Sequence, residues 1–137
     1  AIAAVLDGRR PRIRSDGSPE RDFLYVSDAV AAYLAVERAV GAGGPGAGEA
    51  FNAGGERPYS VAEVLETVVD ISGTELRPEF LGTGNSDGEI DRQFVDSAKL
   101  REMTGWRPEV ELRDGLIRTL GWYRDHPDVR PEPVLSK

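Results

Sequence analysis

The chain has 137 residues, which is enough for one packed core and too few for two large ones. Its 24 acidic and 17 basic side chains give a net charge of -7, so its surface should repel nucleic acid and anionic membranes. The chain has no cysteine and His126 is its single histidine, so we expect no metal site. The lack of cysteine, and of a signal peptide or membrane-spanning run, leads us to expect a cytoplasmic location.

The N-terminal part of the sequence predicts short strands between two helices. In chain order, we expect a helix end at residues 1–6, strands at residues 12–15 and 21–26, and a helix at residues 27–40. Ser27 has the side chain of a good N-cap, and Asp28 lies in the first turn, where the helix dipole favours an anion. Gly41 supplies the stop signal of this helix.

The run G-A-G-G-P-G at residues 41–46 spells G-x-G-x-x-G, a pattern found in dinucleotide-binding sites. That pattern works only between a parallel strand and a helix whose N-terminal amides receive the pyrophosphate. Here it follows a helix and precedes an expected strand at residues 49–54, and the acidic Glu49 comes too soon to bind a ribose. We therefore interpret the run as a loop.

The second half predicts one well-capped helix and two more helices. Ser60 and Glu63 have the spacing of a capping box, at the start of a helix that closes at Gly73. Further elements are expected in this order: strands at residues 75–81 and 90–95, a helix from Asp96 to Gly105, and a helix at residues 111–125. These short strands and about four helices predict an α+β domain, with a loose proline-rich tail at residues 127–137.

Arg21 is the residue that most suggests ligand binding. It stands at the start of an apolar strand, behind a Gly/Pro turn, where a guanidinium can fork onto a phosphate. An ion pair with Glu20 or Asp22 is the alternative, and composition by itself favours it. A group of three acidic residues further on lacks the spacing of a calcium loop and favours a solvated turn: Asp87, Glu89 and Asp91.

Three blocks of sequence point to a family. The first is G-S-P-E-R-D-F-L-Y-V-S-D-A-V-A-A-Y at residues 17–33, and the second is F-N-A-G-G-E-R-P-Y-S-V-A-E-V at residues 51–64. The third is D-S-A-K-L at residues 96–100, followed by G-W-R-P at residues 105–108 and W-Y at residues 122–123. In order and spacing they resemble the C-terminal part of the extended short-chain dehydrogenases, the NAD-dependent sugar-nucleotide epimerase/dehydratase family.

The resemblance implies that residues 1–126 are the nucleotide-sugar-binding domain of a 4,6-dehydratase or 4-epimerase. Such an enzyme moves a hydride from C4 of the sugar to NAD+ and returns it. The family's Rossmann domain and Tyr-x-x-x-Lys pair are absent here, since no tyrosine has a lysine four residues on. The chain alone is then expected to be inactive, with no catalytic or cofactor-binding residue and no bound NAD. The alternative is a free-standing, non-catalytic binding or regulatory remnant of the family.

The resemblance also assigns substrate contacts. Arg21 matches the family arginine that contacts the substrate diphosphate, and Asn52 matches an asparagine near the nucleotide. Glu89 matches an acid that meets ribose hydroxyls. Ser86 stands where relatives have a second phosphate-binding arginine, so Arg92 is the residue expected to compensate.

The absent Rossmann domain has a further consequence for the surface. In relatives that domain covers one side of this region, so apolar side chains should be exposed on strand 23–26 and on the helix that bears Val30, Tyr33 and Leu34. A large uncovered apolar patch marks a partner site or an aggregation hazard. We therefore expect the isolated chain to self-associate.

Overall fold

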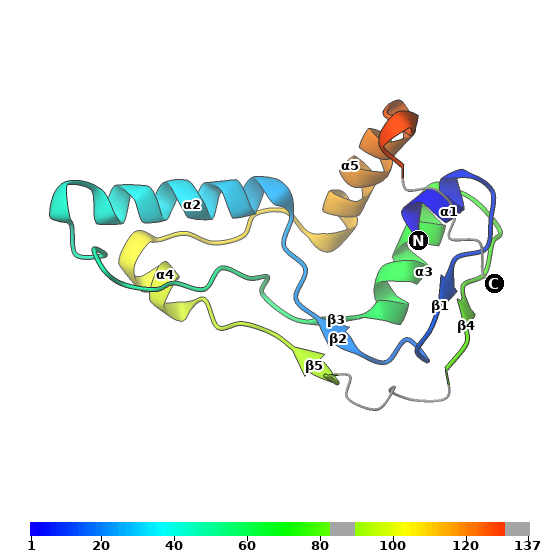
Figure 1. Cartoon of the computed structure of the whole chain (residues 1–137), viewed down its shortest axis with the longest axis horizontal. Helices are drawn as coiled ribbons and strands as arrows, with labels where there is room; N and C mark the ends of the chain where they lie inside the picture. The colour runs from blue at the N-terminus through cyan, green and yellow to red at the C-terminus, as the bar shows by residue number, and fades with distance from the viewer. Residues whose placement is uncertain (83–89, 131–137) are drawn as a thin grey trace. The chain divides into compact units, whose positions relative to one another are not determined.

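The computed structural model describes residues 1–82 and 90–130, which belong to two compact units (Figure 1). Unit 1 comprises Ala1–Pro19, Ser60–Asp91 and Arg113–Lys137, and unit 2 comprises Glu20–Tyr59 and Arg92–Leu112. Unit 1 holds α1 (Ile2–Leu6), β1 (Arg12–Ile13), α3 (Val61–Ser72), β4 (Glu79–Phe80), nearly all of α5 (Leu112–Asp125), and the 3-10 turn η2 (Pro127–Val129). Unit 2 holds β2 (Glu20–Arg21), α2 (Val26–Val40), the 3-10 turn η1 (Gly41–Gly43), β5 (Arg92–Gln93) and α4 (Ala98–Thr104). At β3 (Tyr59–Ser60) the chain passes from unit 2 to unit 1.

Unit 1 has an apolar core between three helices. Val5 of α1, Val68 of α3 and Leu120 of α5 are each no more than 3% exposed and pack together. Partly buried neighbours complete the cluster: Ile2, Leu6, Val69, Ile71 and Leu116. On α3 the core residues recur at helical spacing, as expected for one buried face. The helix predicted between Ser60 and Gly73 is confirmed as α3.

The predicted capping box begins α3. The Ser60 hydroxyl accepts a hydrogen bond from the Glu63 amide at 3.1 Å, and the Glu63 carboxylate accepts one from the Ser60 amide at 2.7 Å. These reciprocal bonds satisfy backbone donors that the first helical turn leaves unpaired. Gly73 ends the helix in the left-handed conformation, with φ of 71°.

The strands are shorter than the sequence predicts. β1 pairs in parallel with β4, Arg12 opposite Glu79, and β2 pairs in parallel with β5, Arg21 opposite Gln93. β3 flanks β2 on its other side. The predicted strand at residues 21–26 is wrong beyond Arg21, because the chain leaves the sheet there and the Asp22 side chain bonds neighbouring backbone amides.

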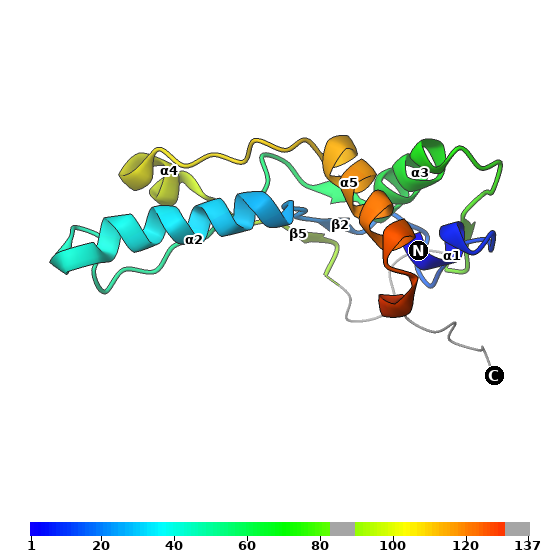
Figure 2. The same ribbon diagram turned by 90° about the horizontal axis from the view of Figure 1, so that it is seen from above.

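Unit 2 combines a small apolar cluster with buried polar side chains. Ala32, Leu100 and Trp106 form the cluster, and α4 lies along α2 in both views (Figures 1 and 2). Asp28 is 5% exposed, and its carboxylate accepts hydrogen bonds from the amides of Glu109 and Val110 at 3.2 and 2.9 Å. The indole of Trp106 donates to the Asp28 carbonyl at 3.2 Å. The first turn of α2 therefore anchors an irregular segment that contains no helix or strand.

The predicted strand at residues 49–54 is also wrong: the segment is extended but pairs with no strand among the described residues. Side chains of the region around α4 hold it instead. The buried Ser97 hydroxyl accepts from the Gly54 amide at 2.9 Å, and Lys99 Nζ donates to the Ala50 carbonyl at 3.0 Å and lies 2.6 Å from Glu49 Oε2. The Lys99 ammonium lowers the pKa of the Glu49 carboxyl, chiefly through this hydrogen bond.

α2 is apolar on two sides. One side packs into the cluster of unit 2, and the other exposes Val26, Val30, Tyr33 and Leu34 at 66%, 51%, 79% and 49%. Phe23, which precedes the helix, is 37% exposed. The predicted exposure of these side chains is confirmed.

Two details of the helices differ from expectation. The described residues contain five α-helices, one more than about four, because the residues expected as the end of a helix form α1. Tyr25, and not Ser27, is the N-cap of α2, since the helix begins one residue before Ser27. No helix among the described residues is long and apolar enough to cross a membrane.

Candidate functional site

The candidate site lies in unit 2, where β2 and β5 run side by side. Their register places Arg21 opposite Gln93 and Glu20 opposite Arg92. Arg92 Nε lies 2.8 Å from Glu20 Oε2 in an exposed ion pair. The half-buried Arg21 donates from Nη1 to the Glu20 carbonyl at 2.8 Å.

A cavity of about 250 Å³ opens beside Arg21. Its lining comes from three separate stretches of chain: Arg21, Asp22, Leu24, Ala53, Gly54, Gln93 and Val95. The guanidinium supplies a fixed positive charge, and the Gln93 amide can both donate and accept. The lining also carries the Asp22 carboxylate, whose two oxygens accept hydrogen bonds from backbone amides, and Arg21 remains the cation that can meet an anionic, oxygen-rich ligand.

The Asp22 carboxylate ties the three stretches together. Its Oδ1 accepts from the Gly55 amide at 2.6 Å, and its Oδ2 accepts from the Val95 amide at 3.2 Å. Gly54 passes so close that an added Cβ would overlap with the side chains of Asp22 and Val95. The N-x-G-G stretch therefore needs glycine here because a carboxylate and a second chain segment occupy the space of a side chain.

Only some of the sequence-predicted contacts meet at this cavity. Arg21 lines it, Asn52 is exposed next to the lining residue Ala53, and Arg92 is held by Glu20 on the neighbouring strand position. Glu89 and Ser86 lie outside the described residues. Sequence reasoning missed Gln93 and the clamping role of Asp22. Two signals in the sequence could have found them: the Arg21-Asp22 pair for Asp22, and the alternation within the predicted strand at residues 90–95 for Gln93.

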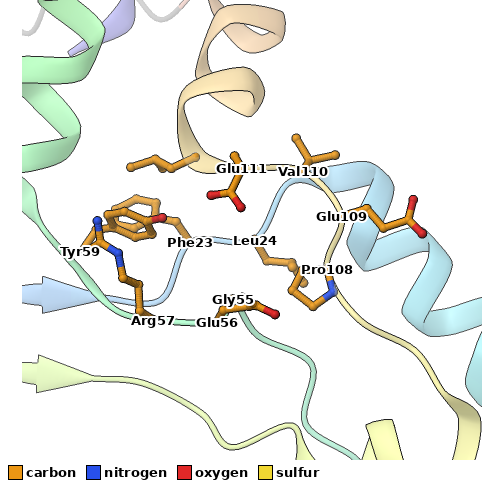
Figure 3. A pocket seen from close by; sticks show the side chains of 11 residues that line it. Phe23, Leu24, Gly55, Glu56, Arg57, Tyr59, Pro108, Glu109, Val110 and Glu111 are labelled. Carbon is orange, nitrogen blue, oxygen red and sulfur yellow. The ribbon is translucent and has the colours of Figure 1, made fainter.

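A second, larger cavity of about 450 Å³ lies elsewhere in unit 2 (Figure 3). Arg57 stacks on Tyr59 in its wall, with the guanidinium carbon 3.7 Å from the ring centroid. The lining carries three carboxylates against this one guanidinium: Glu56, Glu109 and Glu111. Figure 3 shows the Glu111 carboxylate turned toward the cavity. This excess of negative charge opposes a diphosphate more strongly than the single carboxylate beside Arg21 does in the smaller cavity.

The glycine run at residues 41–46 has the wrong surroundings for a dinucleotide. It follows α2, forms the turn η1, and leads into the extended segment at residues 49–54. The loop interpretation is confirmed, because a helix and not a strand comes directly before the run and no helix begins directly after it. Among the described residues there is also no group of three or more His, Cys, Asp or Glu placed to hold a metal ion.

Comparison of the sequence with known proteins identifies a family that this chain resembles. The sequence model of the "NAD dependent epimerase/dehydratase family" matches residues 1–54. A UDP-glucose 4-epimerase of Mycolicibacterium smegmatis is 35% identical over 123 residues, which cover 89% of this chain and 37% of that protein. A dTDP-glucose 4,6-dehydratase of Streptomyces griseus is 32% identical over 126 residues, covering 91% of this chain and 36% of that protein.

Comparison with solved structures points to the same kind of protein. The crystal structure of a UDP-glucose 4-epimerase from Thermotoga maritima, solved with UDP-glucose, superposes with a TM-score of 0.78 at 29% identity. The match covers 92% of this chain and 38% of that one, so the chain spans less than two fifths of the length of these relatives. Taken with the matched residues 1–54, these similarities show that the chain belongs to the NAD-dependent epimerase/dehydratase family.

Proposed function

We propose that this chain is the nucleotide-sugar-binding portion of an NAD-dependent 4,6-dehydratase or 4-epimerase, in which Arg21 binds the diphosphate. The supporting observation is the position of Arg21 at a cavity built from three stretches of chain and fastened by Asp22. A half-buried guanidinium is the group that best matches phosphate oxygens two at a time. Relatives named for UDP- and dTDP-sugars agree with such a ligand.

Other residues at or near the Arg21 cavity are the remaining proposed contacts. The amide of Gln93 lines the cavity opposite Arg21, and Asn52 stands at its edge beside Ala53. Arg92 would have to leave Glu20 in order to meet a phosphate, which makes it a weaker contact than Arg21. Glu89 remains the proposed ribose contact on the strength of the resemblance.

The chemistry of the whole enzyme is proposed to lie on sequence outside this chain. NAD supplies the hydride chemistry of the family, and the chain's glycine run lacks the strand-turn-helix surroundings that would hold it. The same outside sequence would provide the Tyr-x-x-x-Lys pair and a Rossmann domain to cover the exposed side of α2. The chain alone then binds substrate and orients its diphosphate, without catalytic residues or bound NAD. Its cysteine-free sequence fits the cytoplasm.

Titration of the chain with UDP-glucose and dTDP-glucose tests the site. We expect saturable NMR shifts at the Arg21 side chain and at the amides of Gly54 and Gln93. Arg21→Ala should weaken binding by roughly 1.5–3 kcal/mol, the range for hydrogen bonds to a charged group. The matched control Arg38→Ala removes the same charge from the exposed side of α2 and should change little. Equal losses in both variants, or uridine binding as tightly as UDP-glucose, would contradict the proposal.

A further inference from the structure

The C-terminal end of α5 receives hydrogen bonds from the residues that follow it. The last carbonyls of a helix have no amide donor within the helix. The His126 amide donates to the Trp122 carbonyl at 3.0 Å. The Arg130 guanidinium supplies the next two donors, from Nε to the Tyr123 carbonyl at 2.7 Å and from Nη2 to the Arg124 carbonyl at 3.3 Å. Its positive charge also lies at the negative end of the helix dipole, which stabilises the last turn.

The third nitrogen of the same guanidinium contacts the end of α1. Arg130 Nη1 donates to Asp7 Oδ1 at 3.2 Å, across 123 residues of sequence, and the Arg130 side chain is only 18% exposed. Asp7 is the C-cap residue of α1, and its Oδ2 accepts from Arg9 Nη2 at 2.9 Å. Hydrogen bonds from Arg9, chiefly, and from Arg130 lower the pKa of the Asp7 carboxyl. The ionised carboxylate therefore joins both ends of the described chain within unit 1.

α1 has little stability of its own. It spans five residues, has no side-chain hydrogen bond at its N-cap and carries no basic residue in its last turn. A helix this short is marginal in water without tertiary contacts. Yet it contributes Val5 to the core of unit 1, with Ile2 and Leu6 packed beside it, against Val68 and Leu120. Contacts that hold α1 in place therefore also keep this core closed.

We propose that Arg130 is a latch of unit 1: its guanidinium fastens the end of α5 to the end of α1, and its release lets both ends open together. The geometry favours arginine, because a planar fork presents three nitrogens to three acceptors, whereas a lysine ammonium is a point charge on a flexible stem. The loose tail expected from residue 127 would then begin only after Arg130. The proposal does not depend on the nucleotide-sugar site in unit 2.

Residue-resolved hydrogen exchange of the whole chain tests the latch. Arg130→Met removes the fork and the charge, so we expect about tenfold faster exchange at the amides of Val5 and Asp7 in α1 and of His126 after α5. Arg130→Lys keeps the charge without the fork and should give a smaller increase at the same three amides. The amides of α2, in unit 2, should exchange as in the unchanged chain.

Two further variants separate a latch from a simple helix cap. Arg124→Met removes an exposed charge from the same end of α5 and should leave exchange in α1 within about twofold. In an Asp7→Ala background, Arg130→Met should no longer speed exchange in α1, because the connection is already lost.

Three results would overturn the proposal. Faster exchange confined to the end of α5 would leave Arg130 as a helix cap only. An equal effect of Arg124→Met in α1 would make charge alone responsible. An equal rise in α2 would report unfolding of the whole chain instead of a local opening.

Discussion

Unit 1 and unit 2 each contain a small apolar core, but they differ in how their irregular segments are held. In unit 1, three helices pack through Val5, Val68 and Leu120. In unit 2, long segments without helix or strand are fastened by side chains that accept backbone hydrogen bonds: Asp22, Asp28 and Ser97. Buried backbone amides must find acceptors, and irregular chain cannot provide them to itself. Unit 2 therefore depends on polar anchors where unit 1 depends on apolar packing.

The apolar core of unit 1 should show the largest effect. Leu120→Ala removes a side chain that is 3% exposed and leaves a cavity beside Val68, so we expect the free energy of unfolding of unit 1 to fall by about 3 kcal/mol. Residue-resolved hydrogen exchange should show the loss in the amides of α3. The matched control is Ile117→Ala on the exposed side of α5. Equal losses from both variants would contradict an apolar core at this position.

The second-largest loss in the free energy of unfolding is expected from Asp28, a polar anchor of unit 2. Asp28→Ala leaves the amides of Glu109 and Val110 without their acceptor, and we expect the free energy of unfolding of unit 2 to fall by about 2 kcal/mol. Faster hydrogen exchange should appear at these amides and in α2, and the amides of α3 should be spared. Asp114→Ala, an exposed acid in the first turn of α5, is the control. Unchanged hydrogen exchange at the Val110 amide in the Asp28 variant would contradict the dependence of unit 2 on polar anchors.

The exposed side of α2 should make unit 2 the part that self-associates. Tyr33→Lys with Leu34→Lys places charge in the apolar stripe, so light scattering at rising concentration should report a smaller average mass than for the unchanged chain. Ile117→Lys with Trp122→Lys alters two side chains of unit 1 with similar exposure and should leave the mass unchanged. A chain that is monomeric throughout would refute the predicted self-association and favour the free-standing remnant over the enzyme fragment.

The smallest effect should be the pH dependence of a surface pair in unit 2. The hydrogen bond from Lys99 lowers the pKa of Glu49 in the folded chain below its ordinary value of 4.5. The stabilising contribution is therefore fully present above pH 4.5 and is lost as the pH falls through the lowered pKa. In Lys99→Met, NMR titration should show this pKa moving back up. The pKa of Asp7 in unit 1, lowered chiefly by its hydrogen bond with Arg9, should stay the same.

Local patterns along the chain predicted the helices well. The capping box at Ser60 and Glu63, the helix ends at Gly73 and Gly105, and the loop at residues 41–46 all appear as expected. Each depends on backbone groups within a few residues of the signal. The family blocks pointed to Arg21, because a short motif keeps its order along the chain, and its role as a phosphate contact stays a prediction.

The strands and the cavity, in contrast, could not be predicted from local patterns. Residues 21–26 and 49–54 have the composition of strands, yet only Glu20–Arg21 is paired, because a strand requires a neighbour and the described residues offer none further along. Gln93 and Asp22 gained their roles from segments more than 30 residues away. No local pattern contains that information.

The sequence by itself determined the helices, the loop nature of the glycine run and the family, since these depend on spacing within short stretches of chain. Only the tertiary structure decided which residues surround Arg21 and which carboxylates serve as anchors. The physical reason is that long-range pairing satisfies buried amides with whichever acceptor the fold brings near. Asp22 shows this most directly: one carboxylate joins Gly55 and Val95, which the sequence separates by 40 residues.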